Sequence, residues 1–107
     1  MIEVTFYSLD SGALSGFSSL GHANAGDAGN DIVCAAVSSA VYMAANTVTD
    51  VLGIDAQVRC DEAYLSLRIN ADDTEKAQGI LGGLLLHIEQ LQQQYPKNVS
   101  VQKRRCN

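Results

Sequence analysis

A histidine and a cysteine stand twelve positions apart in this chain, at His22 and Cys34, and together they could make a reactive thiolate. Histidine takes up a proton readily near neutral pH, and the thiolate is the nucleophilic form of cysteine. Such a pair is a nucleophile with its base, provided that the segment between them brings the two side chains together. The chemistry it would support is acyl transfer, most simply the hydrolysis of a peptide bond.

The residues around Cys34 favour the same chemistry. Asn30 or Asp31 is a suitable N-cap for the apolar segment that follows, so we expect a helix with Cys34 in its first turn. Backbone N–H groups at a helix start stabilise negative charge, so they could hold the thiolate or a developing oxyanion. The intervening loop could turn back on itself and close as a lid over a peptide, because it is bounded or interrupted by Gly21, Gly26 and Gly29.

Two further polar residues could support the pair. Asp31 lies three residues before Cys34 and would share its helical face; it could cap the helix, the more ordinary role, or orient His22. Ser38 follows Cys34 by about one helical turn and could bond to the site or merely to a backbone carbonyl. We treat both as supporting residues.

Two blocks of this sequence resemble a known family in identity and in spacing. They are Gly-His-Ala at 21–23 and Asp-Ile-Val-Cys-Ala-Ala-Val-Ser at 31–38. The pattern is similar to that of the bacterial ribosomal-processing cysteine proteases, often labelled Prp. The resemblance implies that Cys34 is the catalytic cysteine and His22 the catalytic histidine. It further implies a homodimer without a cofactor, which removes the N-terminal extension of one large-subunit ribosomal protein, the twenty-seventh in the standard naming.

Two other readings of the same residues remain open. In the first, the chain is a non-catalytic dimeric protein-interaction module, with Cys34 buried in its core and His22 an ordinary loop residue. In the second, the thiol has a redox role, although no obvious resolving cysteine accompanies it. Slow alkylation of Cys34 would favour the first reading, and a disulfide between Cys34 and another cysteine the second.

Composition bounds the class of protein. The 107 residues are enough for one domain, 1–107, and the net charge of −5 disfavours direct binding to nucleic acid. No signal peptide is visible at the N-terminus, so we expect a cytoplasmic protein. The apolar run 32–48 is shorter than the ~20 residues of a membrane span, so no membrane is expected. Three cysteines without a C-x-x-C pair predict neither a disulfide framework nor a metal site.

Hydrophobic periodicity predicts the elements that would position these residues. Alternating apolar and polar residues indicate strands, whereas an apolar residue every three or four positions indicates a helix. The expected elements are strands at 2–7 and 14–20, a helix ending before Gly53, strands at 56–60 and 63–69 around an Asp61-Glu62 turn, a helix to about Tyr95, and a strand at 98–102. The order ββαββαβ predicts an α+β fold, a mainly antiparallel sheet covered by two helices.

Three features of the C-terminal half add expectations. Gly82 and Gly83 each cost the second helix about 1 kcal/mol relative to alanine, so we expect a close helix contact there, within the subunit or across a dimer. His87 stands among leucines and is expected to be packed or at an interface. The basic residues 103–105 are expected to form a solvated end of the chain.

Overall fold

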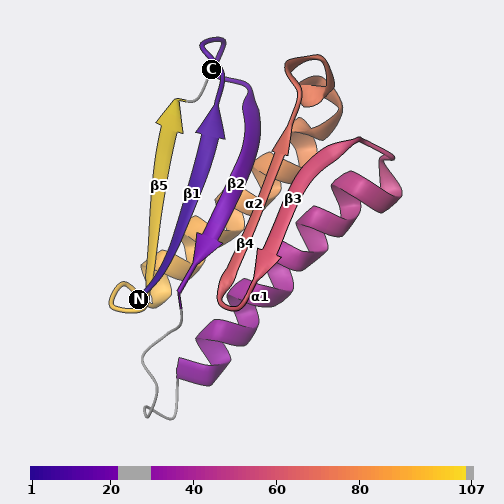
Figure 1. Ribbon diagram of the computed structural model, residues 1–107. Helices are drawn as coiled ribbons and strands as arrows, with labels where there is room; N and C mark the ends of the chain where they lie inside the picture. The colour runs from indigo at the N-terminus through magenta and orange to yellow at the C-terminus, as the bar shows by residue number, and fades with distance from the viewer. Residues whose placement is uncertain (22–29, 106–107) are drawn as a thin grey trace.

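The computed structural model describes residues 1–21 and 30–105, without the side chains of residues 30 and 31 (Figure 1). Five strands and two long helices follow one another in the expected order ββαββαβ. The elements are β1 (Ile2–Ser8), β2 (Leu14–Leu20), α1 (Asn30–Asn46) with a π-helical continuation (Thr47–Val51), β3 (Ala56–Asp61), β4 (Tyr64–Ile69), a short 3-10 turn (Ala71–Asp73), α2 (Thr74–Gln94) and β5 (Val99–Arg105).

The strands form one sheet in the order β3-β4-β2-β1-β5, and both helices cover the same face of it (Figure 1). Strands β1–β2, β2–β4 and β3–β4 pair antiparallel, and only β1–β5 pair parallel. The expected α+β fold with a mainly antiparallel sheet is therefore confirmed. The pairing of β2 with β4 sets Leu20 opposite Tyr64, so the end of β2 lies beside the turn that joins β3 to β4.

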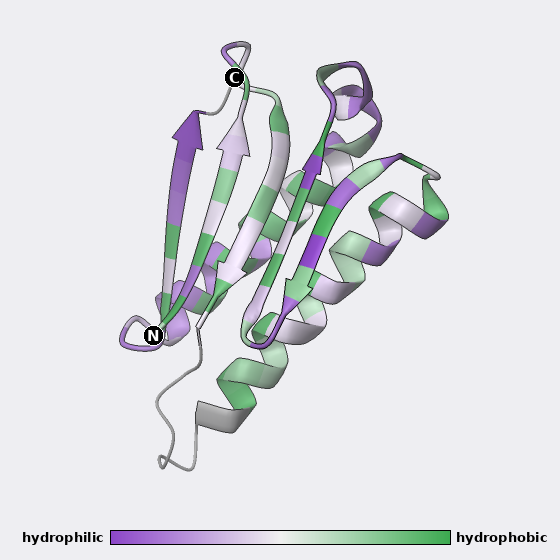
Figure 2. Ribbon diagram, viewed as in Figure 1, coloured by the Kyte–Doolittle hydropathy of each residue, from purple (hydrophilic) through white to green (hydrophobic). Residues whose placement is uncertain are grey.

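The core lies between the sheet and the two helices. Alternate strand residues point towards the helices, and Figure 2 shows the resulting change of hydropathy along β1 and β4. The rings of Phe6 and Phe17 lie side by side at the centre of the sheet, with centroids 6.2 Å apart, and both side chains are fully buried. The helices contribute a buried apolar stripe each: Val33, Val37, Val41 and Ala44 from α1, and Ala77, Leu81, Leu84 and Ile88 from α2.

Helix α1 and its continuation end at Val51, before Gly53 as expected. Together they give an apolar stretch, Ile32–Val51, of 20 residues, which by length and composition could cross a membrane. The expectation of a run shorter than a membrane span is therefore wrong. A core helix passes the same test, and α1 and its continuation bury Val37, Val41 and Val48. This packing favours a core helix.

Two boundaries differ from those expected. The β3–β4 turn lies one residue later, because Asp61 still pairs with Tyr64, and Ala63 adopts a positive φ of 59°. Strand β5 continues through Arg105, so the basic residues 103–105 are part of the sheet and not a tail. They remain exposed, and their position follows from parallel pairing with β1.

The expectations for α2 are also corrected. A side chain placed at Gly82 or Gly83 would meet no described atom within 4 Å outside the helix's own backbone and the glycine's neighbours. The expectation of a close helix contact within the subunit is therefore wrong at these glycines. His87 is exposed and not packed in the core, and it lines a groove between α1 and α2.

Candidate active site

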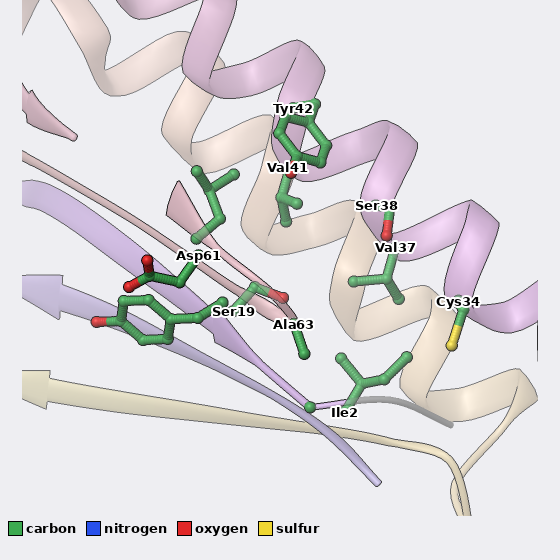
Figure 3. A pocket seen from close by; sticks show the side chains of 12 residues that line it. Ile2, Ser19, Cys34, Val37, Ser38, Val41, Tyr42, Asp61 and Ala63 are labelled. Carbon is green, nitrogen blue, oxygen red and sulfur yellow. The ribbon is translucent and has the colours of Figure 1, made fainter. Parts of the chain in front are cut away.

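Cys34 lines a groove between α1 and the sheet, next to the end of β2 and the β3–β4 turn (Figure 3). The groove has a volume of about 140 Å³. Residues from α1 form one wall, and Gly21, Ala63 and Leu65 contribute from the sheet side. Three segments that are distant in sequence therefore meet at one place.

Helical periodicity explains which α1 residues reach the groove. Cys34, Ser38 and Tyr42 are spaced four apart, so they lie one above the other on the same helical face. Val37 and Val41 lie beside them, line the groove and are buried. Cys34 itself is half-buried and packs against the core, whereas Ser38 and Tyr42 are exposed.

Gly21 fixes the point at which the chain leaves β2. Its φ is +102°, and a Cβ built there would lie 2.5 Å from the carbonyl oxygen of Met1. Its backbone N–H donates a hydrogen bond of 2.9 Å to the carbonyl oxygen of Ala63. Only glycine combines this backbone conformation with so close an approach. The chain therefore turns at the wall of the groove, one residue before His22.

The start of α1 differs from the expectation. The helix begins at Asn30, so Cys34 is its fifth residue and lies in the second turn, not the first. The first four N–H groups of a helix have no partner within the helix, whereas the fifth N–H donates to the carbonyl oxygen four residues earlier. Asn30 and Asp31 are therefore inside the helix and do not precede it. The N–H of Cys34 is not one of the donors expected at a helix start.

Tyr42 is a groove residue that the sequence interpretation did not identify. Its hydroxyl lies 3.3 Å from the Sγ atom of Cys60 on β3. The hydrogen bond with Cys60 is the main cause that raises the pKa of Tyr42 above its ordinary value of 10.0. Its spacing of eight residues from Cys34 places both on one helical face, but this spacing indicates a site residue only once the groove is known.

The structure brings Cys34, Ser38 and Gly21 to one groove. His22, Gly26 and Gly29 lie outside the described residues, and so does the side chain of Asp31. Neither Cys34 nor Cys60 is part of a disulfide. Within residues 1–21 and 30–105, no cluster of three or more His, Cys, Asp or Glu residues could hold a metal ion.

The fold and the groove define a small α+β protein that presents a helix-borne thiol in a groove at one end of a sheet. Comparison with known proteins identifies the family that has this arrangement. The family model described as cysteine protease Prp matches residues 1–100. The ribosomal processing cysteine protease Prp of Bacillus subtilis strain 168 is 32% identical over 108 residues, covering 94% of this chain and 96% of the relative.

Solved structures agree over the whole fold. SMU.848 from Streptococcus mutans has a TM-score of 0.86 at 29% identity, covering 99% of this chain and 96% of that one. The Prp protease of Staphylococcus aureus with a covalently linked product peptide has a TM-score of 0.85 at 25% identity, covering 96% and 99%. The chain belongs to the Prp cysteine protease family, as its motif resemblance implied, and its curated relatives are named for ribosomal processing.

Proposed function

We propose that this protein is a cysteine endopeptidase in which Cys34 is the nucleophile and His22 its general base. The observation that carries the proposal is the groove that Cys34 and Gly21 line together. His22 is bonded to Gly21, and Gly21 is fixed by its hydrogen bond to Ala63 and its approach to Met1. The histidine therefore follows an anchor point in the same groove as the thiol.

The proposed reaction needs only these two side chains and water. The imidazole of His22 takes the proton of the Cys34 thiol, and the thiolate attacks the scissile carbonyl carbon. The C–N bond then breaks, the histidinium returns its proton to the leaving amine, and a thioester remains. Water, deprotonated by His22, hydrolyses the thioester and restores the thiol. The product peptide covalently linked to the S. aureus relative supports a covalent mechanism of this kind.

The remaining site residues have supporting roles in this proposal. Ser38 is exposed in the groove one turn from Cys34, so its hydroxyl is available to bond a substrate. Asp31 precedes Cys34 on α1 and would orient the His22 imidazole. Gly21 anchors the loop, and Gly26 and Gly29 give it the freedom to close over a bound peptide.

We propose the N-terminal extension of the twenty-seventh protein of the large ribosomal subunit as the substrate. Two facts support this choice: the curated relatives are named for ribosomal processing, and the net charge of −5 favours encounter with basic partners such as ribosomal proteins. Under this proposal the protein acts in the cytoplasm during ribosome assembly. It needs no metal or other cofactor, and it binds neither nucleic acid nor a membrane directly.

The proposal includes a homodimer. The groove between α1 and α2 is lined mainly by apolar residues, among them Ala40, Met43, Ile80 and Leu84, and Gly83 lies at its surface. The glycines of α2 have no close contact within the described part of the subunit, so a second copy could approach them closely. His87 would then lie at the interface.

The experiment that tests the function is cleavage of a peptide that spans the extension junction of the organism's own ribosomal protein, followed by mass spectrometry. We expect one cut by the wild type and none by Cys34→Ala or His22→Ala. The chain offers a matched control in its C-terminal cysteine, so Cys106→Ala should retain the cut. Absence of cleavage together with slow alkylation of Cys34 would favour the interaction module instead.

A further inference from the structure

Helix α1 presents three polar groups to the groove at intervals of one turn: the Cys34 thiol, the Ser38 hydroxyl and the Tyr42 phenol (Figure 3). Four helical residues rise by about 6.0 Å, and two residues of an extended chain span about 6.8 Å. The polar groups therefore repeat at nearly the spacing of alternate residues in an extended peptide. A peptide lying along α1 would present every second residue to one of them.

The surroundings of these groups are apolar. Val37, Val41 and Leu65 also line the groove and are buried. A few polar groups placed in an otherwise apolar groove are the usual source of orientation and specificity in binding sites. Tyr42 is 47% exposed, so its ring is accessible to a ligand.

The phenol of Tyr42 is held in place and remains a hydrogen-bond donor. Its hydroxyl contacts the Sγ atom of Cys60 on β3 at 3.3 Å, which limits the rotation of the ring. The same hydrogen bond raises the pKa of Tyr42 above 10.0, so the phenol stays protonated at neutral pH. When the thiol donates to the phenolic oxygen, the phenolic hydrogen is available to an acceptor in the groove.

We propose that Tyr42 is a substrate-binding residue that donates a hydrogen bond to the peptide about four residues from the scissile bond. Eight helical residues separate it from Cys34, a rise of about 12 Å, which an extended peptide covers in about 3.5 residues. Tyr42 is the last α1 residue that lines the groove. This inference rests on the proposed function, because it places the peptide relative to Cys34.

The test combines an enzyme variant with a series of substrates. Peptides spanning the cleavage junction are shortened one residue at a time from each end and offered to the wild type, Tyr42→Phe and the control Tyr95→Phe. One hydrogen bond has a net worth of about 0.5–1.5 kcal/mol, so Tyr42→Phe should raise KM about 2- to 13-fold for the full peptide with kcat unchanged. The difference should disappear once the fourth residue from the cut is removed on one side, and Tyr95→Phe should behave as wild type.

Two results would overturn the inference. One is an unchanged KM for every peptide, and the other is an increase that does not depend on peptide length, which would indicate a structural role for Tyr42. If the wild type cuts no peptide, the proposed function fails separately. The same labelled peptides are then titrated into Cys34→Ala with and without Tyr42→Phe, and fluorescence anisotropy gives the length dependence of binding directly.

Discussion

Replacing Gly21 by alanine tests whether the anchor beside the groove controls both stability and cleavage. The matched control is Gly12→Ala. Both glycines have a positive φ, +102° and +92°, but only a Cβ at Gly21 meets a neighbouring atom, the carbonyl oxygen of Met1 at 2.5 Å. Both variants therefore carry the strain of a left-handed conformation, and only one must also move the backbone.

The magnitudes follow from these contacts. A left-handed conformation costs an L-residue about 1–2 kcal/mol, which is the loss in unfolding free energy that we expect for Gly12→Ala. Gly21→Ala adds the clash and weakens the hydrogen bond from its N–H to Ala63, so we expect a loss of about 2–4 kcal/mol. The chain contains no tryptophan, so urea unfolding is followed by far-ultraviolet circular dichroism.

The effect on activity should exceed the effect on stability. A displacement of 1 Å in a catalytic group can reduce a rate by about 100-fold, so we expect kcat/KM of Gly21→Ala to fall at least about tenfold while the protein is still folded. Gly12→Ala should cleave at the wild-type rate. A Gly21→Ala protein that is as stable as Gly12→Ala and also cleaves normally would refute a role for Gly21 as an anchor.

Three other substitutions have expected outcomes. Gly16→Ala should destabilise more than Gly21→Ala, because its Cβ would collide with the backbone carbonyl of Leu67 across β2–β4; a urea midpoint equal to wild type would contradict this. Gln78→Ala removes the side-chain amide that bonds both the N–H and the carbonyl of Leu14, at 2.8 and 2.7 Å. It should lower the unfolding free energy by about 1–3 kcal/mol in the same assay. Ser38→Ala should lower kcat/KM with an unchanged unfolding midpoint, because the side chain is exposed in the groove; full activity would exclude a substrate contact.

The order of the elements could be predicted from sequence because it depends on local patterns. Alternation in 2–7 and helical spacing after Thr74 report which face of an element is buried. The β3–β4 turn was misplaced because Ala63 adopts φ 59° without the glycine that usually signals such a residue. The length of β5 was underestimated because its pairing with β1, not its own hydropathy, extends the strand through Arg105.

The candidate site was predicted in part. Cys34 and Gly21 were identified from residue types and spacing, and the structure places both at one groove. Tyr42 was not identified from sequence, because its contact with Cys60 requires β3 to lie beside α1. No local sequence pattern records such a tertiary relationship. The residue types of a nucleophile and its base can be recognised in sequence, whereas the wall of a binding groove depends on how distant elements pack.

The most direct test of the pairing of Cys34 with His22 is the rate at which iodoacetamide alkylates each cysteine at pH 6, measured by mass spectrometry in the wild type and in His22→Ala. An ordinary cysteine is well under about 1% thiolate at this pH. We expect Cys34 to be alkylated much faster than the exposed Cys60 in the wild type and to lose this advantage in His22→Ala. Equal rates at Cys34 in the two proteins would contradict this pairing.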